Sequence, residues 1–144
     1  KWYDIMKAYE NNGHAYHTTM PTDSLVQFEK TVLETKEFGL ENATKKQTYI
    51  GKEIRSLLES KGFKSVAAEG FKASSVIVSY TEKDSFQNGK VFAENGMQIA
   101  AGVPLECGEG NYFKTFRLGL FGLDKLQNPE RTISNFKNVF EKVV

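Results

Sequence analysis

The sequence predicts an α+β fold, in which a small, largely antiparallel sheet is covered on one face by helices. Three observations lead to this fold class. Apolar residues recur at helical spacing before Gly62, short strand-like runs with one helix among them follow, and helical spacing returns after Asn128. The length of 144 residues, with 40% apolar residues and 11 Phe, fits one domain with a single core.

Two helices are expected in the first half of the chain. Pro21 favours an extended conformation for residues 16–20 and is itself suited to a first helical turn. The run that follows ends at Gly39, and a second helix extends from about Glu41 to Lys61 before Gly62 stops it. The apolar side chains at helical spacing are Leu25, Phe28, Val32 and Leu33 in the first helix and Ala43, Ile50, Ile54, Leu57 and Leu58 in the second.

The strands are expected in the second half. Alternating or continuous apolar runs place them at residues 63–68, 74–80, 97–100 and 113–120. Within the second of these, Val76, Val78 and Tyr80 should share one face and Ile77 the other.

Two further helices accompany these strands. One, with Phe86, Val91 and Phe92, is expected to be capped by Asp84 or Ser85 and ended by Asn95-Gly96. The last begins at Asn128-Pro129-Glu130, which combine a cap, a first-turn proline and a first-turn acid. Its buried stripe is expected to consist of Ile133, Phe136, Phe140 and Val143.

Charge and composition exclude several classes of protein. The 19 basic and 18 acidic residues give a net charge of +1, so no nucleic-acid footprint is expected. No apolar run approaches the roughly 18–20 residues that span a bilayer, and the N-terminus shows no signal peptide. The single cysteine, Cys107, excludes an internal disulfide and favours a cytoplasmic protein.

Arg117 is the first candidate for a binding residue, because it stands in the middle of an apolar strand. A buried guanidinium needs a partner, and its planar group matches a carboxylate with two parallel hydrogen bonds. Gly119 and Gly122 leave room for close approach. The alternative is an arginine on the solvent side of the strand, with its stem lying over its neighbours.

The segment Tyr16-His17-Thr18-Thr19 is the second candidate. Its hydroxyls, on an extended segment before a helix, suit an anion such as phosphate. The same residues also fit an ordinary helix start with Thr19 or Thr22 as the cap. His14 and His17 have no supporting Cys or carboxylate cluster, so no metal site is expected.

The glycine-rich loop at residues 102–110 is expected to be a flexible surface connection. It leads into a strand and holds two acids, unlike a phosphate-binding loop. Glu106 beside Cys107, with no basic neighbour in sequence, argues against a reactive thiolate.

Together these segments resemble a known family, from about Tyr16 to the end of the chain. Tyr16-His17-Thr18-Thr19-Met20-Pro21 resembles the Tyr-His-x-Thr-x-Pro segment of alanine–glyoxylate and serine–glyoxylate aminotransferases, which are class V enzymes of fold type I. Ser24-Leu25 and residues 37–42 resemble their Ser-Leu … Glu-x-Gly-Leu-Glu-Asn helix pair. Residues 116–122 resemble their Arg-Ile-Gly-x-x-Gly strand, and Ala101-Gly102 stands where many members carry Gly-Gly.

The resemblance implies that residues 16–144 are the C-terminal small domain of such an enzyme and that residues 1–15 are a linker or helix from its large domain. It implies that Arg117 holds the substrate α-carboxylate. It also implies that Tyr16 and Thr19 reach across a homodimer interface to the phosphate of pyridoxal 5'-phosphate in the partner subunit. The substrates would be an amino acid and a 2-oxo acid.

The same resemblance implies that this chain is inactive alone. The family's cofactor-binding lysine precedes the Tyr-His segment, and Lys1 and Lys7 lack its context, so no catalytic residue is expected here. A start without Met and an end within a helical pattern also fit an excised domain. Two other interpretations remain, a stand-alone α+β module that binds a carboxylate metabolite at Arg117 and a domain that dimerises through its helices.

Overall fold

The computed structural model describes residues 1–17, 19–110 and 112–144 and separates into two units, residues 1–37 and residues 38–144. The first unit holds helix α1 (Trp2–Glu10) and most of α2 (Thr22–Phe38). Neither helix has a buried residue, so the apolar side chains that the sequence spaced along them are exposed. Thr18, part of the extended segment expected before α2, lies outside the described residues.

Two turns bound the helices of the first unit. The amide of Gly13 donates to the carbonyl of Ala8 at 2.8 Å, and Asn12 adopts the left-handed region at φ 59°. At the start of α2, the amide of Leu25 donates to the carbonyl of Pro21 at 3.0 Å. Pro21 therefore caps α2 from just outside the helix, one position earlier than the first-turn place that the sequence suggested.

Helix α3 (Leu40–Ser60) opens the second unit. Gly62, at φ 85°, donates its amide to the carbonyl of Glu59, and Phe63 donates to that of Leu58. These two bonds form a Schellman stop, as expected for a glycine just past the helix. The stop turns Phe63 back against the core.

The sheet has the strand order β1-β3-β2, and both pairs are antiparallel. Its strands are β1 (Val76–Tyr80), β2 (Ala100–Ala101) and β3 (Thr115–Gly119). The predicted α+β class is confirmed, although each strand is shorter than the sequence indicated. The strand expected at residues 63–68 is wrong as a regular element, because a single bridge from Ser65 to Ser79 represents it.

One expected helix is two short helices in the structure. Gly89 adopts φ 75° and separates α4 (Asp84–Gln87) from α5 (Lys90–Glu94). The expectation that Asp84 or Ser85 caps this helix is wrong, since the residue at the cap position is Lys83. Asp84 instead accepts a hydrogen bond from Lys114, just before β3.

The end of the chain agrees more closely with the sequence. Helix α7 (Pro129–Val143) begins where it was expected, and the side chain of Asn128 accepts from the amide of Arg131 at 3.0 Å. A short helix that the sequence did not indicate, α6 (Leu123–Leu126), precedes it.

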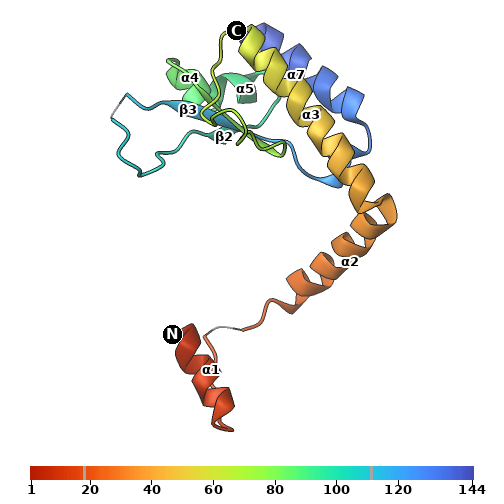
Figure 1. The fold of residues 1–144 in the computed structure, drawn as a ribbon, viewed down its shortest axis with the longest axis vertical. Coiled ribbons are helices and arrows are strands. Elements are labelled where there is room, and N and C mark those ends of the chain that lie inside the picture. The colour runs from red at the N-terminus through yellow and green to blue at the C-terminus, as the bar shows by residue number, and fades with distance from the viewer. Residues whose placement is uncertain (18, 111) are drawn as a thin grey trace. The chain divides into compact units, whose positions relative to one another are not determined.

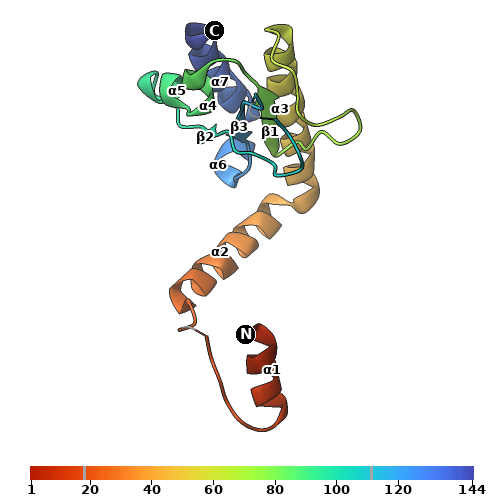
Figure 2. The ribbon, with the colours of Figure 1, turned by 90° about the vertical axis from the view of Figure 1, so that its left-hand side faces the viewer.

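The core of the second unit lies between one face of the sheet and the helices α3 and α7, which run side by side in both views (Figures 1 and 2). Ile77, Phe116 and Leu118 contribute the strand side of this core. The rings of Phe63 and Phe86 stack with centroids 5.2 Å apart. The fully buried apolar side chains are Ile50, Ile54, Leu58, Phe86, Phe92, Phe116 and Phe140. The opposite face of the sheet, the open face, carries Val76, Val78, Tyr80, Ala100 and Arg117.

Candidate functional site

Arg117 lies on the open face of the sheet. Its strand neighbours Phe116 and Leu118 are buried in the core, so the alternation of side chains along β3 turns Arg117 to the opposite face. β3 is the central strand, and Arg117 pairs with Val78 on β1 and with Ala100 on β2. The half-buried guanidinium therefore belongs to the middle of the open face.

One nitrogen of this guanidinium is fixed within the sheet. Arg117 Nε donates to the carbonyl oxygen of Ala101 at 2.8 Å. Within residues 1–17, 19–110 and 112–144, no acidic side chain forms an ion pair with Arg117. Its two terminal amino groups can thus donate to a planar anion with two acceptor oxygens, of which a carboxylate is the simplest.

The guanidinium has small residues beside it on the open face, although a Cβ on Gly119 would lie 3.3 Å from the ring of Phe121. Gly119 follows Arg117 on the same face of β3, and Ala100 lies opposite it on β2. Gly102 has a different role, because a Cβ there would lie 1.8 Å from the carbonyl oxygen of Thr115. Glycine at this position lets the segment after β2 approach β3 closely, which sets the backbone beside Arg117.

The loop at residues 102–110 is organised around one carboxylate, which the sequence did not indicate. Glu109 accepts from the amides of Leu105, Glu106 and Cys107, the last two at 2.8 Å, and from the Cys107 thiol at 3.4 Å. Amide hydrogen bonds, first from Glu109 itself and then from Cys107, lower the pKa of Glu109 to about 2. Hydrogen bonding to Glu109 in turn raises the pKa of the Cys107 thiol. The direction of this pKa shift agrees with the expectation of an unreactive thiol, but its cause is Glu109 and not Glu106.

Two hollows near the sheet do not include Arg117. A hollow of about 430 Å³ lies beneath the loop and has two acids in its lining, Glu106 and Glu109, which disfavour an anionic ligand. A hollow of about 500 Å³ is lined in part by lysines and tyrosines, of which all but the half-buried Lys114 are exposed, namely Lys61, Lys64, Lys83, Lys114, Tyr80 and Tyr112. The chemistry of Arg117 therefore belongs to the open face and not to either hollow.

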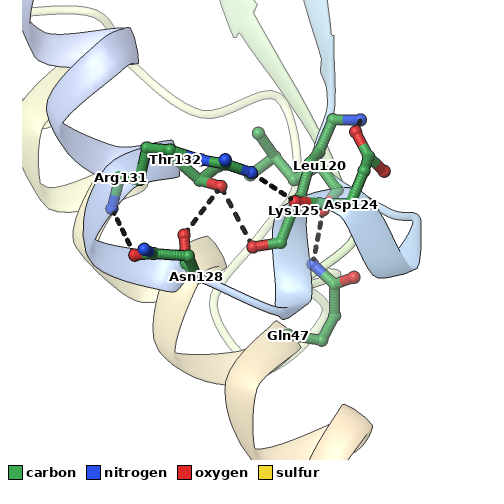
Figure 3. Close-up of polar contacts among 7 residues, drawn as sticks. All are labelled: Gln47, Leu120, Asp124, Lys125, Asn128, Arg131 and Thr132. Carbon is green, nitrogen blue, oxygen red and sulfur yellow. Dashed lines mark hydrogen bonds and ion pairs between the residues drawn. The ribbon is translucent and has the colours of Figure 1, made fainter. Parts of the chain in front are cut away.

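The exit of β3 is tied to helix α3 by one side chain (Figure 3). Gln47 donates from Nε2 to the carbonyl oxygen of Leu120 at 3.2 Å, the contact that Figure 3 shows. It also donates to the carbonyl oxygen of Ser74 at 3.0 Å. Leu120 directly follows β3 and Ser74 precedes β1, so a single amide joins the ends of two strands to the helix. Sequence reasoning missed Gln47, because its partners lie 27 and 73 residues away.

The same helix face holds the segment before β1 at two more points. A Cβ on Gly51 would lie 2.4 Å from the carbonyl oxygen of Ser74, so glycine permits the close approach. Arg55 donates to the carbonyl of Ala73 and to the hydroxyl of Ser65, both at 2.9 Å. The sequence analysis did not identify Gly51 or Arg55, although a glycine and an arginine four residues apart share one face of a helix and could have indicated a close contact there.

Beyond Leu120 the chain is fixed to α7 (Figure 3). Arg131 donates from Nη2 to the carbonyl of Asp124, and the hydroxyl of Thr132 donates to the carbonyl of Lys125, both at 3.0 Å. These bonds hold α6 against the start of α7, so the strand that carries Arg117 leaves the sheet along a fixed course.

Tyr16 and Thr19, the predicted phosphate contacts, belong to the first unit, whereas Arg117 belongs to the second. Tyr16 is 77% exposed, and Thr19 is also exposed. Between them, the ring of His17 meets the ring of Trp2 edge-on, with centroids 5.6 Å apart. His17 therefore packs on α1, while the neighbouring hydroxyls are accessible.

In residues 1–17, 19–110 and 112–144, no group of three or more His, Cys, Asp or Glu side chains is placed to hold a metal ion. None of the helices in those ranges has the length and apolar character needed to cross a membrane.

Comparison with known proteins identifies the fold of the chain. No family model and no curated protein matches the chain. Ureidoglycine–glyoxylate aminotransferase from Bacillus subtilis is similar in structure, with a TM-score of 0.60 and 18% identity over 98% of this chain and 36% of that one. A subgroup IV aspartate aminotransferase from Thermus thermophilus is also similar in structure, with a TM-score of 0.54 and 18% identity, over 99% of this chain and 39% of that one. The chain thus has the fold of part of an aminotransferase and spans well under half of each.

Proposed function

We propose that this chain is the C-terminal part of a pyridoxal-phosphate-dependent aminotransferase of the class V, alanine/serine–glyoxylate type. Residues 16–144 would be its small domain and residues 1–15 the connection to a large domain. Coverage of 36% and 39% of two aminotransferases supports a part of an enzyme. The observation that carries the proposal is the Arg117 guanidinium, which is held at Nε and keeps its terminal amino groups for a ligand.

Arg117 would bind the α-carboxylate of an amino acid or a 2-oxo acid. Two parallel hydrogen bonds from its amino groups fix both the position and the plane of a carboxylate. Ala100, which lies opposite Arg117 on β2, is small and so limits crowding beside the guanidinium. The contribution to the reaction is orientation, which lowers the entropic part of the barrier.

Tyr16 and Thr19 would hold the cofactor phosphate of the partner subunit in a homodimer. Their hydroxyls are exposed, and hydroxyls donate readily to phosphate oxygens, so these residues fit the group. The bound cofactor supplies the electron sink that amino transfer requires. The lysine that binds it would come from the large domain, so this chain alone would be inactive. The single Cys107 supports a reducing, cytoplasmic setting.

A carboxylate-binding module without catalysis is the second candidate. The second unit, residues 38–144, contains a closed apolar core and Arg117 together, so carboxylate binding would not need the large domain. The two candidates differ in what the rest of the protein contains.

The test is a titration of the chain and its variants with pyruvate, in which binding is measured by calorimetry and, where Arg117 is present, also by the NMR signal of Arg117 Nε–Hε. We expect a saturable shift in the chain and binding weakened about 10- to 100-fold in Arg117→Gln, because a hydrogen-bonded charge is lost. Pyruvamide, which has the same shape without the carboxylate, should not shift the signal.

Arg131→Gln is the matched control, since Arg131 is an arginine bound to a backbone carbonyl on α7. It should bind pyruvate as the unchanged chain does. Equal binding by the chain and Arg117→Gln, or equal loss in both variants, would overturn the assignment of Arg117.

A further inference from the structure

The exit of the central strand leaves two carbonyl groups beyond the last strand pair. Val76 and Gly119 form the final pair of β1 and β3, and the amide of Leu120 still donates to the carbonyl of Ser75 at 2.8 Å. The carbonyls of Leu120 and Ser74 come next. Each accepts a hydrogen bond from Gln47, so this side chain adds one more rung to the ladder.

The position of this rung is set by the helix. Gln47 lies on α3, whose residues Ile50 and Ile54 are fully buried in the core. One turn further on, Gly51 brings the helix backbone into contact with Ser74. Because α3 is packed so closely, the amide of Gln47 is a fixed point relative to the core, and the two carbonyls are held to it.

Arg117 lies three residues before Leu120 on the same strand. At the other side, its Nε is bound to the carbonyl of Ala101 on β2. A rotation or slip of the β3 exit would therefore move Arg117 against Ala101. We propose that Gln47 is a positioning residue for Arg117: its two hydrogen bonds fix the end of β3 and so place the guanidinium on the open face. The relevance to substrate binding rests on the proposed function; the positioning itself does not.

The test compares two variants that each remove hydrogen bonds from α3. Gln47→Met keeps the side-chain length and removes the donor. Arg55→Met removes the bonds to Ala73 and Ser65, two turns away. The readouts are the chemical shift and hydrogen-exchange rate of Arg117 Nε–Hε, with the midpoint of thermal unfolding measured for both variants.

We expect Gln47→Met to shift the Arg117 signal and raise its exchange rate about threefold to tenfold, as for the loss of one hydrogen bond's net contribution. Arg55→Met should lower the unfolding midpoint and leave the Arg117 signal in place. Gln47→Lys, which restores donors, should recover the signal in part. An unchanged Arg117 signal in Gln47→Met, or the same change in Arg55→Met, overturns the proposal. If Gln47→Met does not fold, Gln47→Lys is compared with Arg55→Met instead. The proposal is then overturned if the Arg117 signal differs from that of the unchanged chain by the same amount in both variants.

Pyruvate titration of the same variants separates this inference from the proposed function. Gln47→Met should weaken binding about threefold to tenfold relative to Arg55→Met. If the unchanged chain binds no pyruvate while the Arg117 signal responds to Gln47→Met, the carboxylate role fails and the positioning role stands.

Discussion

Glu109 governs the chemistry of Cys107 in the loop after β2. Its carboxylate accepts a hydrogen bond from the Cys107 thiol, and this bond raises the pKa of the thiol. We therefore expect the thiol to react slowly with iodoacetamide at neutral pH, since the thiolate is the nucleophile. Glu109→Gln should speed alkylation severalfold, because the negative charge beside the sulfur is gone. Glu106→Gln is the control, and an equal increase in both variants would contradict the role of Glu109.

The same carboxylate gives the loop a pH dependence. The pKa of Glu109 is lowered from 4.5 to about 2 by the amides that donate to it. Its contribution to the loop is therefore complete above about pH 4.5 and disappears as the pH falls through about 2. The amide shifts of Leu105, Glu106 and Cys107 should follow this titration, and a midpoint near 4.5 would contradict it.

At the scale of single residues, the sequence identifies candidate functional residues when their chemistry conflicts with that of their neighbours. An arginine within an apolar strand is such a conflict, and Arg117 was identified for that reason. Glu109 was missed because its partners are backbone amides, which every residue carries. Gln47 was missed because the helix face and the strand ends it joins are distant in sequence.

At the scale of elements, turn chemistry predicted the ends of helices well. Gly39 and Gly62 adopt positive φ where the helices were expected to end, and Asn128 caps α7 as expected. The strands were harder to predict. The length of a strand depends on how many residues of a neighbouring strand pair with it. Residues 63–68 pair with β1 only at the bridge between Ser65 and Ser79, so they do not form a regular strand.

Two glycines, Gly51 within α3 and Gly62 just after it, separate local from tertiary effects on stability. Helix propensity alone predicts that Gly51→Ala is stabilising by about 0.5–1 kcal/mol. We expect it instead to lower the free energy of unfolding by about 1–3 kcal/mol, because the new Cβ would lie 2.4 Å from the Ser74 carbonyl oxygen. Gly62→Ala meets no atom within 4 Å but has φ 85°, which costs roughly 1–2 kcal/mol. Urea unfolding measures the free energy of unfolding of both variants. A stabilised Gly51→Ala would show that α3 is not packed closely against Ser74.

At the scale of the whole molecule, the two units differ in whether they enclose an apolar core of their own. Residues 38–144 enclose an apolar core, whereas α1 and α2 contain no buried residue. Exposed apolar residues such as Trp2, Phe28 and Leu33 are typical of surfaces that pack against another part of a protein. Residues 1–37 comprise the proposed connecting segment, residues 1–15, and the start of the proposed small domain, and their exposed apolar side chains would find their remaining contacts in a large domain.

The reading frame upstream of the Lys1 codon tests the central claim most directly. Sequencing it in the source transcript should reveal a continuous frame that encodes an α/β region longer than this chain, since the chain spans 36% and 39% of the two aminotransferases. That region should contain a lysine that pyridoxal 5'-phosphate labels permanently when the purified full-length protein is treated with borohydride, which reduces the bond between the cofactor's aldehyde carbon and the lysine amine. A stop codon directly upstream of a start at this position, or a full-length protein with no labelled lysine, would contradict the assignment to an aminotransferase.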